Sequence, residues 1–170
     1  MSNLQIVTGD ILEIDIDCLA HQCNCVTNVS AHMAKAMFDK FPWSDVYSSR
    51  KKVDWKELPE NQKPGNIIVK KDLLSEKRVI SILGQLFPGK PKFPDSKVDG
   101  YLARETNFLN GLKKIRDYEN FKFKEIAFPY KVGCGAAGGN WDHYYQMLET
   151  FANKTGIKVV IVQRKEDGGK

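Results

Sequence analysis

The stretch that most constrains how this chain folds runs from Phe128 to Trp141, with the sequence FPYKVGCGAAGGNW. It predicts the end of a β-strand, then a loop with four glycines within seven residues, then a helix that begins after the capping residue Asn140. Glycine lets the backbone turn sharply and direct its N–H groups inward, and a helix start adds N–H donors with partial positive charge. The stretch therefore indicates an anion-binding loop, usually one for phosphate, although a tight turn before a helix has the same pattern.

Strand-like and helix-like patterns alternate along the rest of the chain. Apolar runs typical of buried strands lie at residues 4–7, 18–20, 67–69, 79–83, 125–128 and 159–162. Apolar residues at helical spacing predict helices over residues 31–41, 102–116 and 141–152. This alternation indicates a three-layer α/β domain with a mostly parallel or mixed sheet.

Three local details of these elements are predicted as well. Ser30 is expected to cap the first helix, and Leu102 and Leu109 are expected on the apolar face of the second. The β-branched residues within 11–14 suggest a further extended piece after a turn.

Length and charge restrict the class of protein. We expect one globular domain over residues 1–164, with a mobile tail at 165–170. The net charge of +5 favours anionic ligands but is well short of a polybasic signal, so neither nucleic acid nor a membrane is expected as a partner. The first residues lack a signal-peptide pattern, and no window approaches the ~18 apolar residues of a membrane span. A cytoplasmic monomer is the resulting expectation.

The four cysteines argue against a metal site. Cys18, Cys23 and Cys25 lie within eight residues, Cys134 lies far along the chain, and their spacing fits no common zinc site. We expect reduced thiols, no metal and no cofactor.

A second loop is predicted at residues 87–99. It contains three prolines and three lysines, a composition that prevents regular structure. A solvated basic loop is expected, with a lid over an anionic ligand as the alternative.

The glycine-rich loop matches neither common nucleotide motif fully. Its spacing Gly133-x-Gly135-x-x-Gly138 is formally that of a dinucleotide site, but the next strand ends at Val162-Gln163-Arg164, without the acidic residue that would bind a ribose. No Lys-Ser or Lys-Thr follows the glycines, as a P-loop requires. The loop thus predicts phosphate binding without naming a nucleotide.

Polar residues follow the buried run at 18–20, in the block His21-Gln22-Cys23-Asn24-Cys25. Such residues lie where α/β folds place ligands. His21 is a candidate acid/base group, and Asn24 can orient a water or a sugar hydroxyl beside it. A hydrogen-bonded core histidine is the alternative, and no nucleophile elbow supports a Ser/His/Asp triad.

Several of these motifs, in their order and spacing, resemble the macrodomain family over most of the chain. They are Gly9-Asp10-Ile11, the strand that ends in Asn24, the helix after a ligand loop, and the stretch from Gly133 to Trp141. The block at 21–25, followed by Met33-Ala34 and Phe41-Pro42, is similar to the branch that includes ADP-ribose 1''-phosphate phosphatases. The resemblance implies a three-layer α/β/α fold with a central mixed sheet.

The resemblance also implies roles for individual residues. Asp10 would accept a hydrogen bond from the adenine amino group, and the backbone at Ile11 would help read the ring. Asn24 would face the distal ribose, and His21 would be the acid/base or nucleophilic residue. The implied catalytic residues are His21 and Asn24, and the implied ligand-binding residues are Gly9, Asp10, Ile11, Asn24, Ser30, Ala31, His32, Gly133, Cys134, Gly135, Ala136, Ala137 and Gly138. Two alternatives stay open, in which Asp10 caps its own turn and Asn24 braces its loop.

One departure from the family bears on function. Members usually carry a glycine run just before the first helix, where this chain has Ser30, Ala31 and His32, so side chains would enter a space that backbone normally approaches. The resemblance implies metal-independent hydrolysis of the terminal phosphate of ADP-ribose 1''-phosphate. The alternatives are a non-catalytic binder of ADP-ribose or a related nucleotide signal, a hydrolase that removes ADP-ribose from glutamate, and a nucleic-acid-binding domain. Ala137 and Gln85-Leu86, standing where the hydrolase would carry its acid and lysine, disfavour the second alternative.

Overall fold

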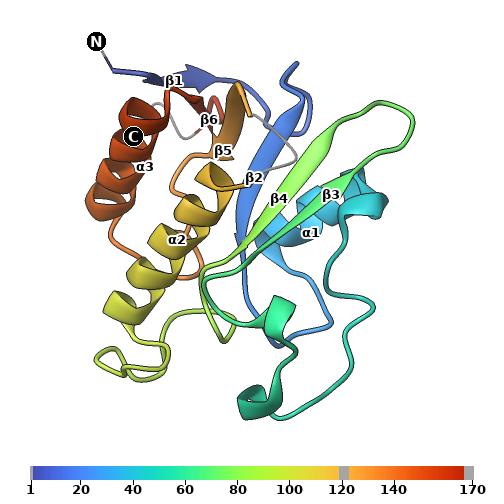
Figure 1. The fold of residues 1–170 in the computed structure, drawn as a ribbon, viewed down its shortest axis with the longest axis vertical. Coiled ribbons are helices and arrows are strands. Elements are labelled where there is room, and N and C mark those ends of the chain that lie inside the picture. Colours follow the sequence, from blue (N-terminus) through green and yellow to red (C-terminus); the bar gives the residue numbers. More distant parts are fainter. Residues whose placement is uncertain (1, 119–122, 167–170) are drawn as a thin grey trace.

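The computed structural model describes residues 2–118 and 123–166 and is built around one six-stranded sheet (Figure 1). In chain order the elements are β1 (Leu4–Thr8), β2 (Cys18–Cys23), α1 (His32–Lys40), β3 (Ile67–Lys71), β4 (Arg78–Leu83), α2 (Tyr101–Arg116), β5 (Glu125–Pro129), α3 (Trp141–Thr155) and β6 (Lys158–Gln163). Short 3-10 helices cover Pro42–Ser44, Trp55–Glu57 and Glu60–Gln62. Of the predicted tail at 165–170, residues 167–170 lie outside the described part.

The sheet is mixed, as the sequence predicts. Its strand order is β1-β6-β5-β2-β4-β3, and only β3 runs antiparallel to its neighbour, in a hairpin with β4. Helix α1 covers one face, and α2 and α3 lie side by side on the other (Figure 1). The three-layer α/β/α architecture is therefore confirmed.

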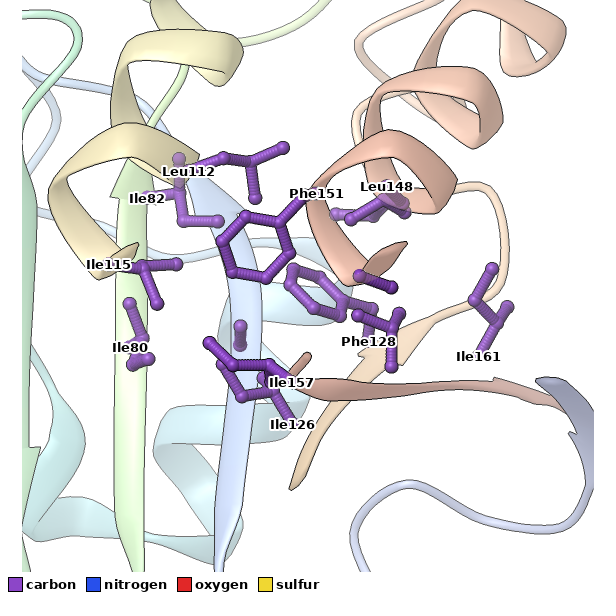
Figure 2. Close-up of a cluster of buried hydrophobic side chains, with 14 of the residues drawn as sticks. Ile80, Ile82, Leu112, Ile115, Ile126, Phe128, Leu148, Phe151, Ile157 and Ile161 are labelled. Carbon is purple, nitrogen blue, oxygen red and sulfur yellow. The ribbon is translucent and has the colours of Figure 1, made fainter. Parts of the chain in front are cut away.

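Each face of the sheet has its own apolar cluster. On the α2/α3 side, side chains of both helices point onto the strands (Figure 2), and the residues that meet there include Ile80, Ile82, Leu112, Ile115, Ile126, Phe128, Leu148 and Phe151. On the α1 side, Leu19, Met37 and Phe38 belong to the second cluster. Successive strand residues alternate between the faces, and both faces are buried, which is why the strands read as nearly continuous apolar runs.

Three local expectations are wrong. Helix α1 begins one residue later than predicted, because its N-cap is Ala31, and no side chain makes a capping bond there. Leu102 and Leu109 are 76% and 39% exposed, because the buried face of α2 runs through Arg104 and Phe108 instead. Residues 11–14 lie largely in turns and add no strand.

Asn140 caps α3 as predicted. Its side-chain oxygen accepts hydrogen bonds from the backbone N–H groups of Asp142 and His143, at 3.0 and 3.4 Å. The helix closes at Gly156 in the left-handed conformation, with φ of 77°. The cap fixes the point where the glycine-rich loop ends.

Candidate functional site

A cleft of about 370 Å³ opens at the carboxyl ends of β2, β4 and β5. The connection after β2 leads to α1 on one face of the sheet, and the connection after β5 leads to α3 on the other. Ligands of open α/β sheets bind at such a switch point. Part of residues 24–31, here the first loop, lines one side of the cleft, and part of residues 130–139, here the glycine loop, lines the other.

The shape of the glycine loop depends on glycine at particular positions. Gly133 and Gly138 have φ of 76° and 77°, a region that side chains disfavour. The backbone N–H of Gly139 donates to the carbonyl of Gly133 at 3.1 Å. A Cβ on Gly133 would lie 2.6 Å from a ring carbon of Tyr144. Gly133 is therefore required for the loop itself.

Gly135 differs from Gly133 in its surroundings. A Cβ on Gly135 would meet no atom within 4 Å, and the residue lines the cleft. The folded chain has room for a side chain at this position. A glycine there leaves the backbone accessible from the cleft.

Arg104, which the sequence analysis missed, joins the glycine loop to the proline-rich segment 87–99. Its guanidinium forms a buried ion pair with Asp99 at 2.7 Å. It also donates to the carbonyls of Gly89 at 2.6 Å and Ala137 at 3.4 Å. The sequence did contain a signal for it, because Arg104 lies four residues before Phe108 and therefore on the same, buried face of the helix. The segment is thus tied down at this point, although it has no regular structure.

The first loop is held by side chains. The Asn24 Oδ1 accepts from the backbone N–H groups of Val26 and Thr27, at 3.0 and 2.9 Å. Arg50 donates to the carbonyls of Asn24 and Thr27, at 2.8 and 3.0 Å. The Tyr47 hydroxyl accepts from the Asn24 N–H at 2.8 Å. Asn24 therefore braces its loop while also lining the cleft, and sequence reasoning did not anticipate Tyr47 or Arg50.

His21 does not lie in the cleft, contrary to expectation. It is 0% exposed, and its Nε2 lies 3.1 Å from the Ser81 hydroxyl. Its ring packs edge-on against Phe38 of α1, at 5.4 Å between centroids. Burial lowers the pKa of His21 to about 4, so the imidazole is neutral near pH 7. Side chains alternate along β2, so that Gln22 lines the cleft and His21 faces α1.

The residues expected at the adenine end lie outside this cleft, after β1. One oxygen of the Asp10 carboxylate accepts from the backbone N–H of Leu12 at 2.9 Å, so Asp10 does cap its own turn. Ile11 is 5% exposed and belongs to the apolar cluster on the α1 side. Gly9 donates its N–H to the carbonyl of Gln163 at 2.9 Å. Because β1, β6 and β5 run parallel, these residues share the sheet edge at which the cleft opens.

The remaining sequence-predicted residues divide between lining and framework positions. Those that line the cleft are Asn24, Ala31, His32, Gly133, Cys134, Gly135, Ala136 and Ala137. Ser30 and Gly138 do not line it, and a Cβ on Gly138 would meet the Lys90 side chain. The structure thus places residues of both loops around one cleft, with His32 in its lining and His21 outside it.

The described lining has basic side chains and no carboxylate. It includes His32 and Lys131 and no aspartate or glutamate. Burial raises the pKa of the Cys134 thiol to about 12 and raises the pKa of Tyr47, so both groups are neutral near pH 7. A cleft of this kind suits an anion.

The buried cysteines are thiols of low reactivity. All four cysteines are unpaired, and burial raises the pKa of Cys23 to about 11 and of Cys25 to about 12. Within residues 2–118 and 123–166, no three His, Cys, Asp or Glu side chains come together in a way that suits a metal ion. The same part of the chain holds no helix long and apolar enough to cross a membrane.

Several solved structures with the same arrangement of strands and helices are macrodomains. One is the macrodomain of Thermus aquaticus DarG, with 20% identity, a TM-score of 0.64, and coverage of 94% of this chain and 97% of that chain. The chain has the macrodomain fold. No family model matches the sequence, and the comparison with curated proteins gave no match.

Two further structures with this fold extend the comparison. A protein of unknown function from Bacteroides thetaiotaomicron has 19% identity and a TM-score of 0.68, over 94% of this chain and 97% of that chain. A mutant macrodomain of Oceanobacillus iheyensis with ADPR has 15% identity and a TM-score of 0.56, over 98% and 88%. At these identities the comparisons show the fold alone.

Proposed function

We propose that the cleft binds ADP-ribose or a closely related nucleotide, with its diphosphate between the first loop and the glycine loop. The observation that carries the proposal is the cleft at the switch point, with an open glycine backbone at Gly135 on one side and no acidic side chain in the described lining. Backbone N–H groups of glycine loops bind phosphate oxygens without the repulsion that a carboxylate would add. The ADPR-bound macrodomain from Oceanobacillus iheyensis supports the choice of ligand.

The sheet edge suggests how such a ligand would lie. With the diphosphate at Gly133–Ala137, the adenine would extend past β6 toward Asp10 and Ile11, and the distal ribose would lie near Asn24. The Asp10 side chain is exposed, so its carboxylate can still accept a hydrogen bond while it caps its turn. The braced first loop would place Asn24 without rearrangement.

Hydrolysis of the terminal phosphate of ADP-ribose 1''-phosphate is the second candidate. A cleft with His32 and Lys131 and no carboxylate in the described lining suits a ligand with an additional phosphate. His21 would take no part in this hydrolysis, since it is fully buried between the sheet and α1. Removal of ADP-ribose from a protein, and binding without turnover, are the competing outcomes.

Calorimetry with ADP-ribose tests the binding proposal directly. We expect one site per chain with a Kd on the order of 1 µM, which corresponds to about −8 kcal/mol. A phosphate-release assay with ADP-ribose 1''-phosphate, run beside it, separates a hydrolase from a binder. Free ribose 5-phosphate serves as the control ligand, because it lacks adenine and diphosphate. Absence of heat with ADP-ribose at millimolar concentration would contradict the proposal.

A further inference from the structure

Two residues of the cleft hold their backbones in a conformation that favours glycine. Among the described non-glycine residues, only His32, Glu76 and Lys131 have positive φ, of 53°, 63° and 59°. His32 and Lys131 both line the cleft, on opposite sides, while Glu76 lies in the turn between β3 and β4. Strained backbones of this kind persist where the surrounding structure enforces them, often at ligand sites.

The same two residues are the basic side chains of the cleft. Both are exposed, and they belong to separate segments, since His32 opens α1 and Lys131 follows β5. No described carboxylate lies within ion-pair distance of Lys131, and its ammonium group lies 5.7 Å from the ring centre of its neighbour Tyr130. A glycine at either position would remove the strain of the positive φ. The presence of His32 and Lys131 there instead suggests that their side chains have a function.

We propose that His32 and Lys131 form a specificity-determining pair that contacts a phosphomonoester on the ligand, in addition to the diphosphate. The inference rests on the proposed function, because it assigns a second anionic group to the same cleft. The glycines of the glycine loop offer backbone donors, and the side chains of His32 and Lys131 add N–H donors from two segments of the chain. A ligand that carries the extra phosphate is therefore preferred over ADP-ribose itself.

The alternative is that the two side chains only point into solvent. Glu76 illustrates that case, because it has positive φ in an exposed turn and pairs with Lys71 at 3.3 Å, away from the cleft. It provides a matched control. Substitution by glycine relieves the same backbone strain at all three positions, but it removes a cleft side chain at only two of them.

The test measures the Kd of ADP-ribose and of ADP-ribose 1''-phosphate for the unaltered protein, His32→Gly, Lys131→Gly and Glu76→Gly. Phosphate release is followed in parallel, so that turnover is not mistaken for weak binding. We expect the unaltered protein to prefer the phosphorylated ligand at least tenfold, and each cleft variant to reduce that preference about fivefold. The affinity for ADP-ribose, which lacks the extra phosphate, falls less than the affinity for the phosphorylated ligand. Each glycine variant, Glu76→Gly included, raises Tm by about 2 °C.

The outcomes are distinct. If neither ligand binds the unaltered protein, the proposed function itself is wrong. If ADP-ribose binds but the phosphorylated ligand is not preferred, or if the preference survives in both cleft variants, the specificity pair is wrong while the proposed function stands. His32→Asn and Lys131→Asn separate the basic side chain from the backbone conformation, because asparagine tolerates positive φ but carries no basic group, and both should lose the preference.

Discussion

The two loops that face each other across the cleft keep their shape by different means. The glycine loop depends on backbone conformations and close packing, with Gly133 against Tyr144. The first loop has no glycine and depends on side-chain hydrogen bonds from Asn24 and Arg50. Where a loop depends on glycine conformations and close packing, larger side chains are poorly tolerated. Where a loop is held by hydrogen bonds from buried side chains, the residues that face the ligand can differ without loss of its shape. Side chains enter the cleft beside the first loop at His32, and at the start of the glycine loop at Lys131.

The buried pair of Arg104 and Asp99 supports the glycine loop from outside. We expect Arg104→Met to lower the free energy of unfolding by about 3–5 kcal/mol, because it leaves a buried carboxylate without its partner. Urea denaturation measures this loss. Lys35→Met is the control, since the Lys35–Asp39 pair is more than half exposed and should contribute at most about 0.5 kcal/mol. Equal losses in the two variants would show that the buried pair does not support the cleft.

Gly133→Ala and Gly135→Ala sharpen the comparison within the glycine loop. The first should lower the free energy of unfolding by about 2–4 kcal/mol, from positive φ and from overlap with Tyr144. The second should change stability by less than about 0.5 kcal/mol, since its Cβ meets no atom within 4 Å. It should nevertheless weaken ADP-ribose binding about tenfold, which is about 1.4 kcal/mol, by blocking the backbone. Thermal unfolding and calorimetry on both variants test the difference, and reversed effects would contradict it.

His21 provides a test on the side of the first loop, because β2 leads directly into it. The native pKa is lowered to about 4 from an ordinary 6.5, so between these values the unfolded chain binds more protons than the folded one. Stability is therefore full above pH 6.5 and falls on acidification, by about 2 kcal/mol between pH 7.5 and pH 5.

The matched variant for this pH dependence is His21→Gln. It should flatten the dependence of unfolding free energy on pH, as measured by urea denaturation at each pH. Its affinity for ADP-ribose at pH 7.5 should stay within threefold, because His21 does not line the cleft. A large loss of ADP-ribose affinity without loss of stability would show that His21 contributes to ligand binding.

The sequence allowed the glycine loop, the helix cap at Asn140 and the alternation of strands and helices to be predicted, because each is a local pattern of spacing or backbone freedom. It misplaced His21, since a polar residue just after an apolar run can face either side of the sheet. It also missed Arg104, Tyr47 and Arg50, whose partners lie between 5 and 33 residues away along the chain. Contacts at such separations depend on how the elements pack.

By itself, the sequence determined the layers of the fold and one side of the cleft, since periodicity and glycine content act within a few residues. Only the tertiary structure decided which polar groups meet there. The parallel pairing of β2 with β4 buried His21 against Ser81, and the opposed crossovers after β2 and β5 brought His32 and Lys131 to one cleft. Those placements depend on strand order and handed connections, which no local pattern of residues encodes.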